Sequence, residues 1–175
     1  MRKIILDKDE LSGTILDLGG GGEGVIGRIC GGRVTAIDNR QEELDEATAG
    51  ARKLLMDARK LQFPDEAFDC VTSFYTLMYI QREDHGAVAR EAYRVLKSGG
   101  IFHVWDGEIF SAYPEPYLAE LDIDAAGEAI HTTYGIIKEN AAQDADWVTE
   151  VCVRAGFTPV QRVEEAGHFR LAFQK

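Results

Sequence analysis

The stretch from Thr14 to Gly24 reads TILDLGGGGEG, and it decides the fold. A β-type run over residues 14–18 leads straight into five glycines and one glutamate. Glycine tolerates positive φ and lets a ligand touch the backbone, so a strand that enters such a loop and then a helix is typical of a ligand-binding turn. We therefore expect a strand over 14–18, a binding loop over 19–24 and a helix over about 23–30.

Downstream of this loop, β-type runs and helical segments alternate. A helix over about 39–49 and another over about 84–97 are expected between strands over 33–37, 53–56, 70–74 and 101–105. Asn39 is placed to cap the first of these helices, with Glu42 completing a capping-box-like pair. Strands separated by single helices predict a parallel sheet with helices on both faces.

Residues 107–141 follow a less regular pattern. The run 130–137 reads as an extra strand, and 117–123 fits either a helix or a strand that pairs with it. The length of 175 residues fits one domain over 1–175. Since the chain shows no separate substrate domain, we expect residues 1–13 and 107–141 to cover the substrate side of the ligand site.

The C-terminal third ends in a helix and two strands. A helix over 144–155 has one apolar face and stops at Gly156, and strands over 158–164 and 168–174 are joined by a tight turn, which makes them antiparallel. The predicted fold is α/β. It is a Rossmann-like, doubly wound, seven-stranded sheet, mostly parallel with an antiparallel C-terminal strand, and with helices on both faces.

The composition narrows the possible partners. Asp and Glu number 30 against 19 Lys and Arg, a formal net charge of −11, and such a surface disfavours nucleic acid. No apolar run approaches the ~20 residues of a membrane span. The three cysteines stand far apart and no CxxC occurs, so we expect no metal site and a reduced, cytoplasmic protein. The oligomeric state stays open, with a homodimer as one option.

Two ligand classes fit the glycine loop. The spacing Gly19-x-Gly21-x-x-Gly24, with Asp38 at the end of the second strand, matches a dinucleotide fingerprint. However, Asp17 and Glu23 would place negative charge beside a pyrophosphate. A cationic ligand without phosphate meets no such repulsion.

The same residues resemble a known family. Residues 15–21 (ILDLGGG) look like the first motif of class I S-adenosylmethionine-dependent methyltransferases, apolar-apolar-Asp-apolar-Gly-x-Gly-x-Gly. Glu23 stands at the family's third glycine, and Gly24 follows one residue later. Further matches come in order: the acid Asp38, the segment from Asp57-Ala58 to Phe68-Asp69, and the helix and turn over 91–100. The resemblance covers residues 15 to about 106.

This resemblance implies S-adenosylmethionine as the cofactor. In the family, the acid at the position of Asp38 accepts both ribose hydroxyls, and the acid at the position of Asp57 accepts the adenine amino group. The implied cofactor-binding residues are Asp17, Gly19, Gly20, Gly21, Asp38, Asn39, Asp57, Ala58, Ser73 and Phe74. Simpler roles stay open for three of them: Asp17 as a hydrogen-bond acceptor for the loop, Asp38 as a helix cap and Asp57 as a turn residue.

Methyl transfer from a sulfonium needs orientation of the acceptor more than a dedicated catalytic group. Candidates for a general base are Asp106, Tyr75 and Tyr79, which follow the strands over 70–74 and 101–105. The chain lacks the Asn/Asp-Pro-Pro-Tyr and Pro-Cys motifs of enzymes that methylate bases. We therefore expect a small-molecule acceptor, or else a macromolecule with a neutral or basic surface. The alternatives are an NAD(P)-dependent oxidoreductase and a non-catalytic protein that only binds S-adenosylmethionine.

Overall fold

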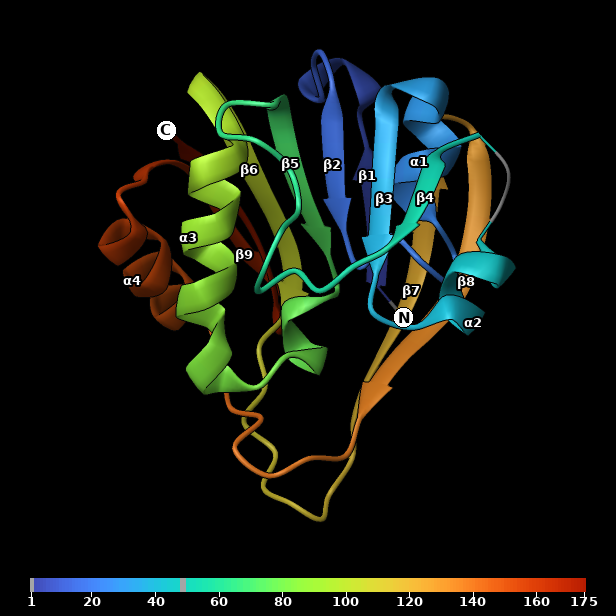
Figure 1. Cartoon of the computed structure of the whole chain (residues 1–175). Helices are drawn as coiled ribbons and strands as arrows, with labels where there is room; N and C mark the ends of the chain where they lie inside the picture. The colour runs from blue at the N-terminus through green and yellow to red at the C-terminus, as the bar shows by residue number, and fades with distance from the viewer. Residues whose placement is uncertain (1, 48–49) are drawn as a thin grey trace.

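The central element is a seven-stranded sheet, seen in a computed structural model that describes residues 2–47 and 50–175 (Figure 1). Its strand order is β4-β3-β2-β5-β6-β10-β9. All neighbours from β4 to β6 are parallel, whereas β10 runs antiparallel to both β6 and β9. The predicted fold class is confirmed. The strands are β2 (Ile15–Leu18), β3 (Val34–Asp38), β4 (Arg52–Leu55), β5 (Phe68–Phe74), β6 (Leu96–Gly107), β9 (Thr158–Glu165) and β10 (His168–Gln174).

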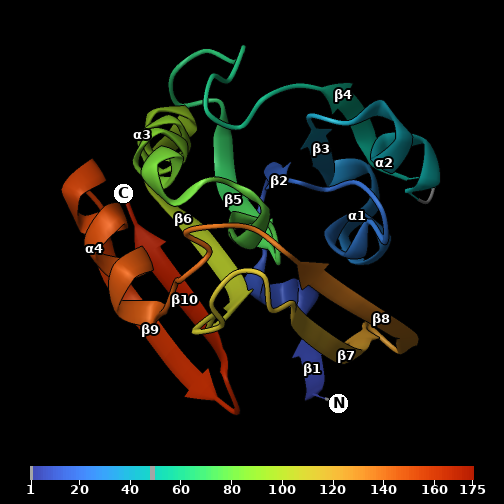
Figure 2. The ribbon, with the colours of Figure 1, turned by 90° about the horizontal axis from the view of Figure 1, so that it is seen from below.

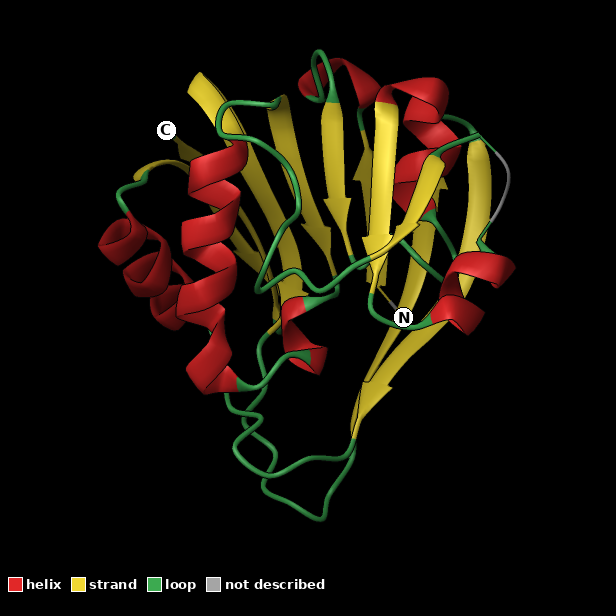
Figure 3. Ribbon diagram, viewed as in Figure 1, coloured by secondary structure: helices red, strands yellow, loops and turns green. Residues whose placement is uncertain are grey.

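Helices α3 (His85–Val95) and α4 (Ala145–Ala155) cover one face of this sheet (Figures 2 and 3). They bury an apolar stripe that includes Val88, Ala92 and Val148 against the sheet. Asp144 caps α4 by accepting a hydrogen bond from the Trp147 N–H at 2.7 Å, and Gly156 ends it at φ 111°. No helix within the described ranges is long and apolar enough to cross a bilayer.

A second sheet packs with α1 (Val25–Cys30) on the opposite face (Figure 2). Its order is β1-β7-β8, formed by β1 (Arg2–Leu6), β7 (Tyr117–Ala125) and β8 (Glu128–Ile136). Alternate residues of β7 are buried: Ala119, Leu121, Ile123 and Ala125. Of the two alternatives for residues 117–123, the strand is therefore the correct one, and the extra strand over 130–137 is confirmed. The pairing of β1 with β7 joins the two segments expected to cover the substrate side.

Several predicted boundaries shift. Asn39 does not cap α2 (Gln41–Glu46), because the N-cap residue is Arg40, whose N–H donates to Asp38 Oδ1 at 3.0 Å. The predicted end of this helix, at residue 49, lies outside the described residues. Helix α1 starts at Val25, because Gly24 is left-handed at φ 57°. Helix α3 ends at Val95, and the next strand begins at once.

Candidate functional site

A cleft of about 920 Å³ lies at the carboxyl ends of the central strands. The chain order changes direction between β2 and β5, which is where open α/β sheets bind ligands. The carboxyl ends of β2, β3 and β5 reach the same edge of the sheet (Figure 1). Strand β8 adds residues 132–135 as a further wall.

Most of the predicted site residues line this cleft. They are Asp17, Gly19, Gly20, Gly21, Asp38, Asn39, Asp57, Ala58, Phe74, Tyr75 and Tyr79. Ser73 and Asp106 lie off the cleft, and neither side chain is exposed. Side chains alternate along a strand, so when Phe74 faces the cleft its neighbour Ser73 faces the other side of the sheet.

The glycine loop is packed too closely to carry side chains. Gly19 has φ 68°, and a Cβ there would collide with the Thr76 side chain. A Cβ on Gly20 would stand 2.5 Å from Asp17 Oδ2, and one on Gly21 would stand 2.5 Å from the Cβ of Glu43. These positions therefore require glycine, and all three glycines line the cleft.

Asp17 is buried beneath the glycine loop. The Thr72 hydroxyl donates to its Oδ1 at 2.7 Å, and only 2% of the residue is exposed. Burial raises the pKa of the Asp17 carboxyl to about 7, against the Thr72 hydrogen bond, and the charge of Asp38 adds a smaller rise. A cation in the cleft would favour ionised Asp17.

The cleft is acidic. Among the described residues that line it, seven are carboxylates and three are arginines. The arginines are paired: Arg28 with Glu23 and Glu128, Arg40 with Glu43, and Arg59 with Asp57 and Asp84. Such a lining favours a ligand that carries positive charge.

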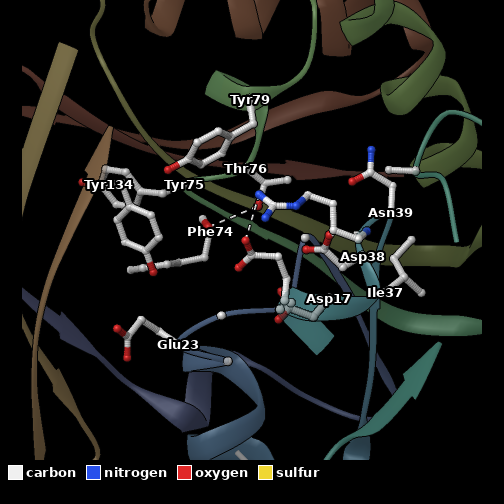
Figure 4. A pocket seen from close by; sticks show the side chains of 18 of the residues that line it. Asp17, Glu23, Ile37, Asp38, Asn39, Phe74, Tyr75, Thr76, Tyr79 and Tyr134 are labelled. Carbon is white, nitrogen blue, oxygen red and sulfur yellow. Dashed lines mark hydrogen bonds and ion pairs between the residues drawn. The ribbon is translucent and has the colours of Figure 1, made fainter. Parts of the chain in front are cut away.

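An aromatic wall lies across the cleft from Asp17 and Asp38 (Figure 4). Tyr75 stacks on Tyr134 of β8 with ring centroids 5.1 Å apart and an interplanar angle of 11°, and Phe74 meets Tyr75 edge-on. Tyr75 holds a left-handed backbone at φ 49°, and its hydroxyl is hydrogen-bonded to His168 Nδ1 at 2.7 Å. Non-glycine residues in this conformation persist where their surroundings hold them firmly, often at functional sites.

Tyr79 joins the main sheet region to the second sheet. Its hydroxyl accepts a hydrogen bond from the Gly135 N–H of β8 at 3.2 Å, and 49% of the residue is exposed. Among the candidates for a general base, Tyr79 is therefore both in the cleft and reachable from solvent. Residues 132–135 belong to the segment 107–141 that we expected to cover the substrate side, and they line the cleft.

Asp106 instead holds two loops together. Its Oδ1 accepts hydrogen bonds at 2.8 Å from the Gly107 N–H and from Gln143 Nε2, and its Oδ2 accepts one from the Met78 N–H at 3.2 Å. Burial raises the pKa of Asp106 to about 7, against these hydrogen bonds, which lower it. A residue with these contacts supports the cleft from behind and does not face an acceptor.

The two buried carboxyls predict a pH-dependent stability. Folded Asp17 and Asp106 keep their protons up to about pH 7, whereas the unfolded chain loses them near pH 4. Their contribution to stability is thus present below about pH 4 and is lost as the pH rises through 7. In urea titrations from pH 5 to 8, the free energy of unfolding should fall, by up to about 1.4 kcal/mol per pH unit for each group.

Asp17→Asn isolates one of these contributions, since asparagine keeps an acceptor for Thr72. The variant should show a clearly shallower pH slope than the wild type. Equal slopes for the two proteins would contradict the raised pKa of Asp17.

The matches to known proteins agree with this geometry. A family model described as "Methyltransferase domain" matches residues 16–104, just over half of the chain. The chain belongs to this methyltransferase domain family. The match runs from β2 into β6 and so includes the glycine loop, the acid at the end of β3 and the acid after β4.

Two relatives of the family share part of the sequence. A sterol 24-C-methyltransferase of Neurospora crassa is 29% identical over 126 residues, covering 65% of this chain and 33% of that protein. A ubiquinone/menaquinone biosynthesis C-methyltransferase of Pseudomonas putida is 36% identical over 110 residues, covering 52% of this chain and 42% of that protein. The matched segment thus spans less than half the length of each relative.

A solved structure shares the fold over nearly the whole chain. It is an S-adenosylmethionine dependent methyltransferase from Mesorhizobium loti, with a TM-score of 0.66 and 19% identity, and the match covers 93% of this chain and 90% of that one. At this identity the similarity establishes the fold, and the function has to be argued from the cleft.

Proposed function

We propose that the chain transfers a methyl group from S-adenosylmethionine to a small-molecule acceptor. The observation that carries this proposal is the cleft itself: an open glycine loop and an acidic lining at the switch point of the family's fold. S-adenosylmethionine carries a sulfonium and an ammonium and has no phosphate, so it matches this lining. When bound, it supplies the electrophilic methyl group.

The role of the chain's own residues would be to bind the cofactor and orient it. Asp38 lies at the end of β3, where its carboxylate can accept both ribose hydroxyls, and Asp57 lies after β4, where the adenine amino group would be. The glycine loop would pass beside the methionine part, above buried Asp17. The three carboxylates are already held in place by hydrogen bonds. The Arg40 N–H donates to Asp38, Arg59 donates to Asp57 and Thr72 donates to Asp17.

The acceptor would lie against the aromatic wall. Phe74, Tyr75 and Tyr134 line the cleft as an aromatic cluster, in which Tyr75 and Tyr134 are stacked and Phe74 meets Tyr75 edge-on. Such a cluster can attract a sulfonium by cation–π interaction and pack against an apolar acceptor. Tyr79 is placed to hydrogen-bond the acceptor. The two relatives named above are methyltransferases of a sterol and of quinone biosynthesis, which supports a small-molecule acceptor. The second sheet, with β8, would cover it.

Ligand-induced stabilisation tests the cofactor. S-adenosylhomocysteine or S-adenosylmethionine at 100 times its dissociation constant should stabilise the fold by about 2.7 kcal/mol. For a chain of this length that raises the melting temperature by about 5–10 °C. NAD and NADP should give no shift, since Asp17 and Glu23 oppose a pyrophosphate.

A shift with NAD but none with S-adenosylhomocysteine would overturn the cofactor assignment in favour of an oxidoreductase. Activity needs a separate measurement, in which purified protein is screened against phenols, quinols and other small acceptors for S-adenosylhomocysteine release. Binding without release to any acceptor class would favour a protein that only binds the cofactor.

A further inference from the structure

Arg59 bridges the two walls at one end of the cleft. Its Nη1 donates to Asp84 Oδ2 at 2.7 Å, and its Nη2 donates to Asp57 Oδ2 at 2.7 Å. Asp57 and Arg59 follow β4, whereas Asp84 is the N-cap residue of α3. All three residues line the cleft. One guanidinium therefore ties together two loops that are separate in the sequence.

Arg59 also sets the direction of the Asp57 carboxylate. Its Nε lies 3.0 Å from both Asp57 oxygens, and its backbone N–H donates to Oδ1 at 2.8 Å. A carboxylate has about four acceptor sites, so Asp57 retains capacity for one more donor. The hydrogen bonds from Arg59 thereby fix the direction in which the remaining acceptor site of Asp57 points. These hydrogen bonds also hold the pKa of Asp57 below its usual range, so it stays an acceptor.

We propose that Arg59 is a positioning residue that makes the cleft specific for an adenine base. It orients Asp57 toward the amino group of the base and, through Asp84, holds the two walls together around the ring. The planar guanidinium has the geometry for this double role, since its fork binds one carboxylate side-on and another end-on, which a lysine ammonium does not do. This inference rests on the proposed function, because it assumes that the adenine of the cofactor lies beside Asp57.

The chain offers a matched control. Arg162 also bridges two carboxylates, Asp146 and Glu164, at 2.6 Å each, and is exposed to a similar degree as Arg59, 42% against 47%. It lies outside the cleft residues. Arg162→Ala therefore removes an equivalent surface ion-pair network without touching the site.

The test is calorimetric titration of S-adenosylhomocysteine into the wild type, Arg59→Ala, Asp84→Ala, the double variant and Arg162→Ala. Arg59→Ala should bind about five- to tenfold more weakly, which is the loss expected when two exposed ion pairs are removed. Asp84→Ala should bind a few-fold more weakly. The double variant should bind as Arg59→Ala does, because Arg59→Ala already removes the ion pair between Arg59 and Asp84. Arg162→Ala should bind as the wild type does. Melting temperatures without ligand confirm that each variant is folded.

Base discrimination separates positioning from simple support of the fold. The wild type should bind S-adenosylhomocysteine more tightly than S-inosylhomocysteine, whose base lacks the amino group, and Arg59→Ala should reduce this ratio. Arg59→Lys should reduce it too. If the wild type binds neither ligand, the proposed function itself fails. If the wild type binds and Arg59→Ala leaves both affinity and base ratio within twofold, or binds more tightly, the role of Arg59 is refuted.

Discussion

Gly21→Ala is expected to weaken S-adenosylhomocysteine binding by about a hundredfold, through the addition of a single methyl group. The new Cβ would stand 2.5 Å from the Cβ of Glu43, 3.0 Å from its carbonyl carbon and 2.9 Å from Asp38 Oδ2. Two of these atoms belong to α2 and the third to the ribose-binding candidate. Because real Cβ atoms do not approach so closely, the loop, α2 or Asp38 has to move.

The cost should appear in stability as well as in affinity. Overpacking of this kind typically destabilises a fold by about 1–3 kcal/mol. The Gly22 N–H donates to the Glu43 carbonyl at 2.8 Å, so a shift of α2 also strains this link between helix and loop. Isothermal titration and a urea melt of the same preparation would measure both losses.

Gly32→Ala is the control for this substitution. A Cβ at Gly32 meets no heavy atom within 4 Å, and the residue is not left-handed. The same methyl group should therefore leave affinity and melting temperature close to those of the wild type. Binding by Gly21→Ala within threefold of the wild type would mean that the loop yields easily and is not a rigid cradle.

The glycine loop also shows why most of this fold was predictable from sequence. Three strands of the parallel part end in a marker with a local cause: the glycines after β2, Asp38 at the end of β3 and Asp57 after β4. Such signals need no long-range information. Ala126-Gly127 is a similar local signal: both residues have positive φ, at 55° and 94°, as a tight turn between β7 and β8 requires.

What sequence reasoning missed depends on contacts between distant residues. Nothing near Arg59 reveals that Asp84 lies opposite it across the cleft, and nothing in residues 2–6 indicates that they pair with β7. Asn39 looked like a helix cap, but the side chain one residue earlier, Asp38, took the Arg40 N–H. Asp106 stands at a strand end, where a catalytic acid is expected, but it is fully buried and accepts hydrogen bonds from three donors.

Asp38→Ala is expected to lower the affinity for S-adenosylhomocysteine by about a hundredfold or more. Each hydrogen bond to a charged group contributes about 1.5–3 kcal/mol, and the variant loses the two that the ribose hydroxyls would donate. The free energy of unfolding should fall much less than the free energy of binding. The Arg40 N–H before α2 loses its acceptor, and one such hydrogen bond contributes about 1 kcal/mol.

Two further variants test whether the weaker binding of Asp38→Ala comes from the loss of its contact with the ribose. Asp38→Asn keeps one acceptor oxygen but loses the charge, so its affinity should lie between that of the wild type and that of Asp38→Ala. Glu42→Ala removes an exposed carboxylate of α2 that does not line the cleft, and it should leave affinity unchanged. A large loss in Glu42→Ala would mean that overall charge, and not a ribose contact, drives binding.

The 2′-deoxy analogue of S-adenosylhomocysteine completes the double-mutant cycle. In the wild type, the missing hydroxyl should weaken binding about tenfold or more, because Asp38 then lacks one donor. In Asp38→Ala the same deletion should change little, because the acceptor is already gone. Additive losses would show that the ribose and Asp38 do not touch. Asp38 would then act only as the acceptor of the Arg40 N–H, and the ribose site would have to be sought elsewhere in the cleft.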